Sequence, residues 1–78
     1  MKLKEFKNLG HYHFILQFEN GEMKDADLKN LISDKVKENE LKTAHIDKDW
    51  GCLEFNDGMI DIEPNTLYKF CISSTENL

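Results

Sequence analysis

Three histidines are the side chains of this sequence best suited to hold a metal ion. His11 and His13 are two positions apart, so on an extended strand both side chains lie on one face. A metal site would need a third ligand, and His45 or a carboxylate from another strand is the candidate. The simpler interpretation places both histidines on the exposed face of a half-buried strand. We adopt it, and predict neither a bound metal nor another cofactor.

Acidic residues near the ends of predicted strands are the candidates for acid–base chemistry: Asp25, Asp27, Asp61 and Glu63. Two carboxylates can act as acid and base when burial separates their pKa values. Each of these four has a simpler task in a turn or a helix cap. The sequence has no glycine-rich phosphate loop and no nucleophile elbow. A sheet protein of 78 residues also has little depth for a substrate pocket. We predict that the protein is not an enzyme, with no catalytic residue.

The segment 47–51, Asp-Lys-Asp-Trp-Gly, is similar to the start of a calcium-binding loop. It lacks the third oxygen ligand before the glycine and the glutamate at the twelfth position. We interpret it as a polar hairpin turn whose aspartates accept hydrogen bonds from the backbone. Trp50, the single tryptophan, lies in this turn. It either folds over the sheet as core, which we favour, or is exposed as a contact for a partner.

The two cysteines, Cys52 and Cys71, have no metal-binding spacing around them. A disulfide is disfavoured in a reducing cytoplasm. Both residues have apolar neighbours in the sequence. We predict that both are small buried hydrophobic residues rather than reactive thiols.

The charge balance limits the partners of the protein. All 10 basic residues are lysine, and 15 acidic residues give a net charge of −5. Arginine, which grips phosphate and reads guanine with two donors, is absent. The net field repels a polyanion, so we expect no direct binding of nucleic acid. The basic cluster of Lys2, Lys4 and Lys7 is interpreted as a solvated terminal strand or tail.

Membrane insertion is not expected from the hydropathy of the sequence. The apolar stretches are far shorter than the roughly 20 residues of a membrane-spanning helix. The basic N-terminus is not followed by the apolar run and cleavage site of a signal peptide. We therefore expect a cytoplasmic protein.

The first half of the sequence predicts a hairpin followed by a helix. Residues 11–19 alternate between apolar and polar positions, as in a half-buried strand. Asn20-Gly21 is a strong signal for a tight turn, and 22–26 is the expected return strand. Asp27 is a candidate helix cap, before a helical apolar stripe of Leu28, Leu31 and Ile32. The charged segment 35–41 is either a second short helix or an ordered loop.

The second half predicts three strands and a closing helical turn. The strands are expected at 43–47, 52–55 and 59–62, separated by turns at 48–51 and 56–58. Pro64 suits the first position of a helical turn over 65–70. We expect a domain over residues 1–72 and a flexible C-terminal tail over 73–78. The residues expected to form turns and caps are Gly21, Asp27, Gly51, Gly58, Asp61 and Pro64.

These elements predict an α+β domain. It would hold a small antiparallel, meander-like sheet of about five strands, as two hairpin units, with one or two short helices on one side. The sequence Phe-Glu-Asn-Gly at 18–21 is echoed by Phe-Asn-Asp-Gly at 55–58. Two units of one design, or chance convergence on good hairpin chemistry, would each explain this echo.

The same residues resemble domain-of-unknown-function family 2442. The first half carries an apolar strand, a glycine turn, a polar strand and an Asp-Leu step, at 14–21 and 27–28. The second half carries the family's strand, glycine turn, strand, glycine turn, Asp and Pro-x-x-Leu-Tyr order, at 44–47, 50–51, 53–55, 57–58, 61–62 and 64–68. The resemblance covers about residues 10–70. This chain departs from the family pattern at Phe55, where tryptophan is usual, and in the more charged segment 35–42.

The resemblance implies a small bacterial protein, with some relatives fused to a helix-turn-helix domain or encoded beside toxin–antitoxin genes. It supplies no catalytic residues. We predict a non-catalytic module that binds another protein, with an antitoxin-like role as one version and Trp50 as the interaction candidate. The alternatives are a nucleic-acid-associated regulator that acts through a partner or an oligomer, and a small metal-binding protein or enzyme. A homodimer through an exposed sheet edge is also compatible with the sequence.

Overall fold

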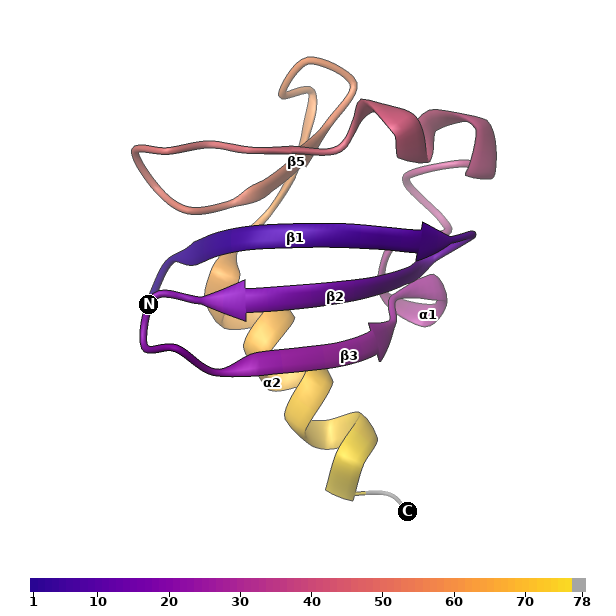
Figure 1. Ribbon diagram of the computed structural model, residues 1–78. Helices are drawn as coiled ribbons and strands as arrows, with labels where there is room; N and C mark the ends of the chain where they lie inside the picture. The colour runs from indigo at the N-terminus through magenta and orange to yellow at the C-terminus, as the bar shows by residue number, and fades with distance from the viewer. Residues whose placement is uncertain (77–78) are drawn as a thin grey trace.

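The first part of the chain forms a three-stranded antiparallel sheet followed by one helical turn (Figure 1). A computed structural model describes the backbone of residues 1–76 and the side chains of residues 1–73. The sheet has the order β1-β2-β3, and a short helix follows it. The elements are β1 (Leu3–Gly10), β2 (His13–Phe18), β3 (Met23–Asp27) and α1 (Lys29–Ile32).

The second part repeats this order with shorter strands and a longer helix. A 3-10 helix, η1, leads into a second antiparallel sheet of order β4-β5-β6, and α2 follows. The elements are η1 (Glu38–Thr43), β4 (His45–Ile46), β5 (Leu53–Phe55), β6 (Ile60–Ile62) and α2 (Pro64–Glu76). The sequence echo thus lies in two units with the same order of strands and helix.

The α+β class is confirmed, but the prediction of about five strands in one meander is wrong in detail, because six strands form two sheets. The backbone joins the sheets where the Leu3 amide donates to the Gly51 carbonyl at 3.0 Å. Gly51 has φ +71°, and a Cβ there would lie 2.3 Å from Lys2 Cβ. This contact requires glycine both for the left-handed backbone and for the close approach.

The core lies between the two sheets and α2. The expected alternation of β2 is confirmed, because Phe14, Leu16 and Phe18 are fully buried. The Phe55 ring packs edge-on against Phe14, with centroids 6.4 Å apart, and Phe18 packs edge-on against Tyr68 of α2 at 5.3 Å. Offset or edge-on pairs of this kind add to the stabilisation from buried area. Helix α2 crosses behind β1-β2-β3 and covers their inner face (Figure 1).

Strand β1 resolves the N-terminal segment, which the sequence left open between a terminal strand and a tail. The lysine-rich N-terminus is a strand rather than a tail, with Lys4 and Lys7 exposed on it. A tight turn joins it to β2, with φ +119° at Gly10 and +49° at His11. His11 therefore lies in the turn and not on the strand expected to begin there, which starts at His13. The Asn8 side-chain amide secures the turn by donating from Nδ2 to the His11 carbonyl at 2.9 Å.

The segment 35–41, left open between helix and loop, contributes to η1. The Lys37 amide donates to Glu40 Oε1 at 2.8 Å at the start of this helix. The Tyr12 hydroxyl donates to the Val36 carbonyl at 2.6 Å and ties the segment to the first sheet. Burial raises the pKa of Tyr12, and the carboxylates of Glu38 and Glu40 raise it further. The segment is therefore ordered by a few buried contacts despite its high charge.

Most predicted caps and turns lie close to their expected places. Asp27 Oδ1 accepts from the Lys29 amide at 2.9 Å, but Asp27 ends β3 and the N-cap of α1 is Leu28, one residue after the expected cap. Pro64 is the first residue of α2, as expected. The helix continues to Glu76, well beyond the expected end at residue 70. A flexible tail was expected over 73–78. Residues 73–76 belong to α2, and residues 77–78 lie outside the described residues. Asp61 lies in the middle of β6 rather than in a turn or cap.

Candidate protein-interaction site

Trp50 lies at the tip of the turn between β4 and β5, and 74% of it is exposed. The expectation that it packs as core is wrong. The turn is closed by backbone bonds from Gly51 to the Asp47 carbonyl at 2.6 Å and from Asp47 to the Cys52 carbonyl at 3.0 Å. Asp47 Oδ1 also accepts from the Asp49 amide at 2.9 Å. These bonds confirm the polar turn, and it is Gly51, not Trp50, that packs against β1.

Lysines surround a hollow of about 330 Å³ beside this turn. Lys2, Lys4 and Lys48 line it, together with Leu3, Glu19 and Ile46. Glu19 Oε2 accepts from the Lys2 amide at 2.7 Å and lies 4.0 Å from the terminal amine of Met1, which partly offsets the positive charge. The observed basic cluster therefore consists of Lys2, Lys4 and Lys48. It contains Lys48, which is distant in the sequence, in place of the predicted Lys7.

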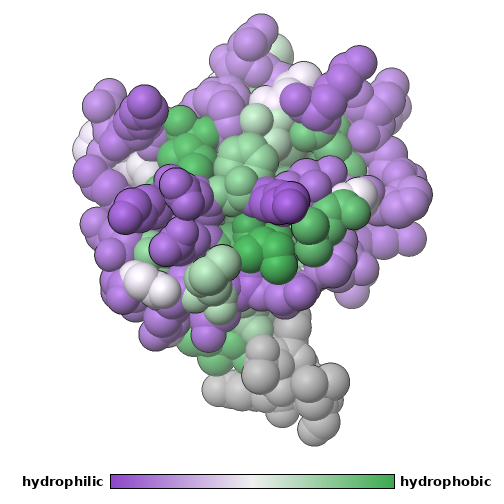
Figure 2. Space-filling view, viewed as in Figure 1, coloured by the Kyte–Doolittle hydropathy of each residue, from purple (hydrophilic) through white to green (hydrophobic). Residues whose placement is uncertain are grey.

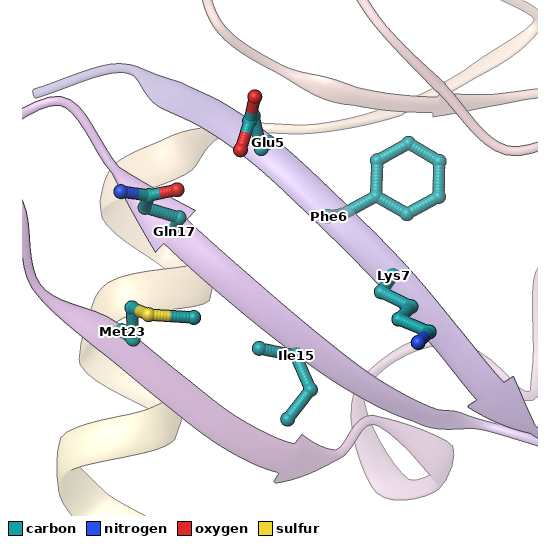
Figure 3. A pocket seen from close by; sticks show the side chains of 6 residues that line it. All are labelled: Glu5, Phe6, Lys7, Ile15, Gln17 and Met23. Carbon is teal, nitrogen blue, oxygen red and sulfur yellow. The ribbon is translucent and has the colours of Figure 1, made fainter.

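The outer face of the first sheet, turned away from α2, carries a second hollow of about 170 Å³. Ile15 and Met23 contribute apolar side chains, and Glu5, Lys7 and Gln17 contribute polar ones; the Phe6 ring points away from them (Figure 3). Gln17 pairs with Met23 across the strands, and Ile15 is the diagonal neighbour of Met23. Figure 2 shows hydrophobic residues gathered over this face with hydrophilic residues around them.

The structure separates the three histidines. His11 Nδ1 contacts Glu38 Oε1, and His13 Nε2 contacts Asp25 Oδ1. His45 Nε2 lies 2.8 Å from Glu54 Oε1 in the second sheet. Among the described residues, no three His, Cys, Asp or Glu side chains are placed to hold a metal ion. Each histidine has a carboxylate of its own instead.

His45 has a pKa above its ordinary value of 6.5. The main cause is its hydrogen bond with the Thr43 carbonyl, at 3.2 Å from Nδ1. The Glu54 carboxylate adds to the rise, while burial opposes it. Since protonation lets both ring nitrogens donate, the charged form is the one that these two acceptors stabilise.

The four acidic candidates do not converge on one site. Asp25 contacts His13, and Asp27 accepts from the Lys29 amide. Asp61 lies opposite Glu54 on β5, and Glu63 directly precedes α2. Asp25 and Asp27 thus lie in the first sheet, Asp61 lies in the second, and Glu63 lies between β6 and α2.

Both cysteines are buried, as predicted. Cys52 is 8% exposed and Cys71 is 4% exposed. Burial is the main cause that raises the pKa of each thiol. A raised pKa lowers the fraction of reactive thiolate at neutral pH. Their burial and pKa agree with a role in packing.

Two features of the surface were missed from the sequence. Lys48 joins the basic hollow only because the β4–β5 turn folds back onto β1, which no local pattern indicates. The apolar centre of the outer face carried a signal, because Ile15 is an apolar residue in the outward-facing series of β2. Read together with Met23 across the hairpin, that residue would have indicated the patch.

Comparisons with known proteins agree with the sequence resemblance. Within the described residues, no helix is long and apolar enough to cross a membrane. The comparison with curated proteins and the comparison with solved structures each return no match. A family model described as "Protein of unknown function (DUF2442)" matches residues 3–73, which is nearly the whole chain. The chain therefore belongs to the DUF2442 family.

Proposed function

We propose that this protein is a non-catalytic module that binds another protein, with Trp50 as its main contact. The observation that carries the proposal is the 74% exposure of Trp50 on a turn closed by backbone hydrogen bonds. Tryptophan is among the residues that dominate binding energy at protein interfaces. A turn that is already ordered loses little conformational entropy on binding, so more of the contact energy contributes to affinity.

The charge of the chain suggests what kind of partner it suits. A net charge of −5 favours the approach of a basic protein surface. An antitoxin-like role, in which this acidic domain masks a basic surface of its partner, is one specific version of the proposal.

The proposal is tested by capture at endogenous expression level, with and without nuclease, followed by identification of what co-purifies. We expect a stoichiometric protein that survives nuclease and is lost from the Trp50→Ala variant. Met59→Ala is the matched control, because Met59 is 86% exposed in a different turn. A partner retained equally by both variants would contradict the role of Trp50, and the absence of any protein partner would contradict the proposal itself.

A nucleic-acid-associated role is the second candidate, favoured by the hollow of Lys2, Lys4 and Lys48 next to the Trp50 turn. Lysines beside an exposed aromatic ring are the elements of single-strand binding. The net negative charge opposes it, so this role would act through a partner or an oligomer. A gel-shift assay at low salt decides: a clear shift by the isolated chain, lost on Lys48→Gln, would rank this candidate first.

A further inference from the structure

Strand β3 is an open edge of the first sheet. It pairs with β2 on one side only, and the Phe18 amide donates to the Glu22 carbonyl at 2.9 Å. In an antiparallel pair, hydrogen-bonded and non-bonded positions alternate along each strand. This register directs the amide and carbonyl groups of Met23 and Asp25 away from β2. Among the described residues, the backbone bonds outside regular elements involve neither residue, so both are available to a further strand.

The rest of the fold would support a strand at this edge. Helix α2 passes behind the sheet and continues beyond β3, so its C-terminal part extends past the last strand (Figure 1). Lys24 Nζ lies 5.5 Å from the centre of the Tyr68 ring, which places the first half of α2 under β3. A strand added beside β3 would therefore have a helix behind it, as β1 and β2 have.

The side chains of β3 indicate which kind of strand could pair with this edge. Met23 is 63% exposed, and the Asp25 side chain is likewise 63% exposed. Asp27 is also exposed, and it lies on the same outer face because it is two residues farther on. The outer face of this edge thus carries three side chains spaced two residues apart, one apolar followed by two acidic. Asp25 already contacts His13 Nε2 and Asp27 accepts from the Lys29 amide, but both carboxylates remain exposed. Basic side chains spaced two residues apart on an added strand would therefore lie opposite them.

The antiparallel self-pairings that overlap most of β3 bring like charges together, whereas the register centred on Met23 does not but overlaps the strand only at that residue. In antiparallel self-pairing, the register centred on Asp25 places this carboxylate opposite its own copy. The register centred on Lys24 opposes two lysines, and the register centred on Ala26 opposes Asp25 and Asp27. Each of these registers places like charges directly opposite one another, which destabilises a sheet. The net charge of −5 on each chain adds to the repulsion.

We propose that β3 binds an extended segment of another protein, with lysine or arginine at alternate positions, as a fourth strand of the first sheet. This inference rests on the proposed function and names the chemistry of the partner. Backbone hydrogen bonds to Met23 and Asp25 hold the segment, and the carboxylates of β3 select its basic residues.

The test uses the full chain, labelled with nitrogen-15, and two synthetic nine-residue peptides. One peptide alternates lysine with valine, and the other alternates glutamate with valine. We expect the lysine peptide alone to bind, and to slow hydrogen exchange of the Met23 and Asp25 amides more than of any other amide. Binding of neither peptide, equal binding of both, or protection centred elsewhere would overturn the inference.

Two pairs of variants separate the backbone and charge contributions. Met23→Pro removes an outward amide that an edge strand can lose without breaking its own ladder, whereas Met23→Ala keeps it. We expect the proline variant to lose binding and the alanine variant to keep most of it. Asp25→Lys should weaken binding about tenfold, while the exposed loop control Asp34→Lys should leave it nearly unchanged. If thermal melting shows that the proline variant is unfolded, the charge-reversal pair decides alone.

The outcomes also separate this inference from the proposed function. A captured partner that depends on Trp50 but binds Met23→Pro and Asp25→Lys at full strength leaves the proposed function intact and overturns the strand addition. Sedimentation equilibrium tests whether a second copy of this chain occupies the edge instead. A dimer of the wild-type chain that Met23→Pro converts to monomer would assign the edge to a second copy and overturn the inference.

Discussion

The two units of this protein share an order of elements and differ in what holds them together. The strands of the first sheet have 8, 6 and 5 residues, whereas those of the second have 2, 3 and 3. Long strands are stabilised by many backbone hydrogen bonds, and strands this short are not. The second sheet depends instead on a few buried side chains and on polar contacts with η1. A shared topology can therefore be maintained by different interactions.

The polar contacts of the second unit centre on Thr43. Its Oγ1 donates to the Glu40 carbonyl at 2.6 Å and accepts from the Asn56 amide at 2.9 Å. The Asn56 side-chain amide in turn donates to Glu40 Oε2 at 3.0 Å. These bonds tie the end of η1 to the β5–β6 turn, where Asn56, Asp57 and Gly58 all have positive φ. In the first unit, by contrast, the β2–β3 turn directly joins two longer strands.

The largest effect should come from Phe55→Ala. Phe55 is fully buried, and its loss leaves a cavity between the two sheets. We expect a loss of about 3–5 kcal/mol in the free energy of unfolding, measured by urea denaturation. Hydrogen exchange should show the amides of β4–β6 losing more protection than those of β1–β3. Equal loss in both sheets would contradict the contrast between the units.

The next effect tests the contact that joins the units. Gly51→Ala places a methyl group against Lys2 in a left-handed conformation and should cost about 2–3 kcal/mol. Gly21→Ala is the control, because its φ is +89° but nothing lies within 4 Å of the added Cβ. We expect the control to cost about 1 kcal/mol, from backbone strain alone. Similar losses for the two variants would show that the close approach of β1 is not needed.

A smaller effect should follow from Thr43→Val, which keeps the shape of the side chain and removes its hydroxyl. We expect a loss of about 1–2 kcal/mol, because the Asn56 amide loses its acceptor. Thr66→Val on the exposed surface of α2 makes the same exchange without these bonds. If both variants melt at the same temperature, side-chain hydrogen bonds do not hold the second unit.

The smallest effect concerns pH and is confined to the second sheet. The pKa of His45 is raised in the folded protein, chiefly by its hydrogen bond with the Thr43 carbonyl. Its contribution to stability is therefore fully present below the ordinary pKa of 6.5 and is lost as pH rises through the folded value. The stability difference between wild type and His45→Gln should shrink over that interval. A difference that grows with pH would have the wrong sign.

Sequence reasoning recovered the elements whose signal is local. The β2–β3 hairpin was predictable because strict alternation and Asn20-Gly21 agree on one register. The N-terminal segment was left open between a strand and a tail because its inward residues Leu3 and Phe6 are three apart. A register shift between Leu3 and Glu5 breaks the period of two. The helix in 35–41 depends on tertiary contacts such as Tyr12 to Val36, which no local pattern shows.

The candidate site was only partly predictable for the same reason. Trp50 was identified as a residue of interest, but its exposure depends on the Gly51 contact with β1, which is distant in the sequence. The open edge of β3 was accessible to reasoning because a polar return strand suits a sheet edge. Which face of which sheet remains uncovered depends on where α2 packs, and that is decided by the whole core.

The most direct test of the central claim is the fluorescence of Trp50 itself, since the chain has one tryptophan. In the free protein, a soluble quencher should reach it readily. Adding the captured partner should shift its emission to shorter wavelength and protect it from the quencher, because an interface excludes water. A parallel titration of Trp50→Phe corrects for fluorescence from the partner. Unchanged emission and quenching while the partner stays bound would contradict the claim that Trp50 forms the interface.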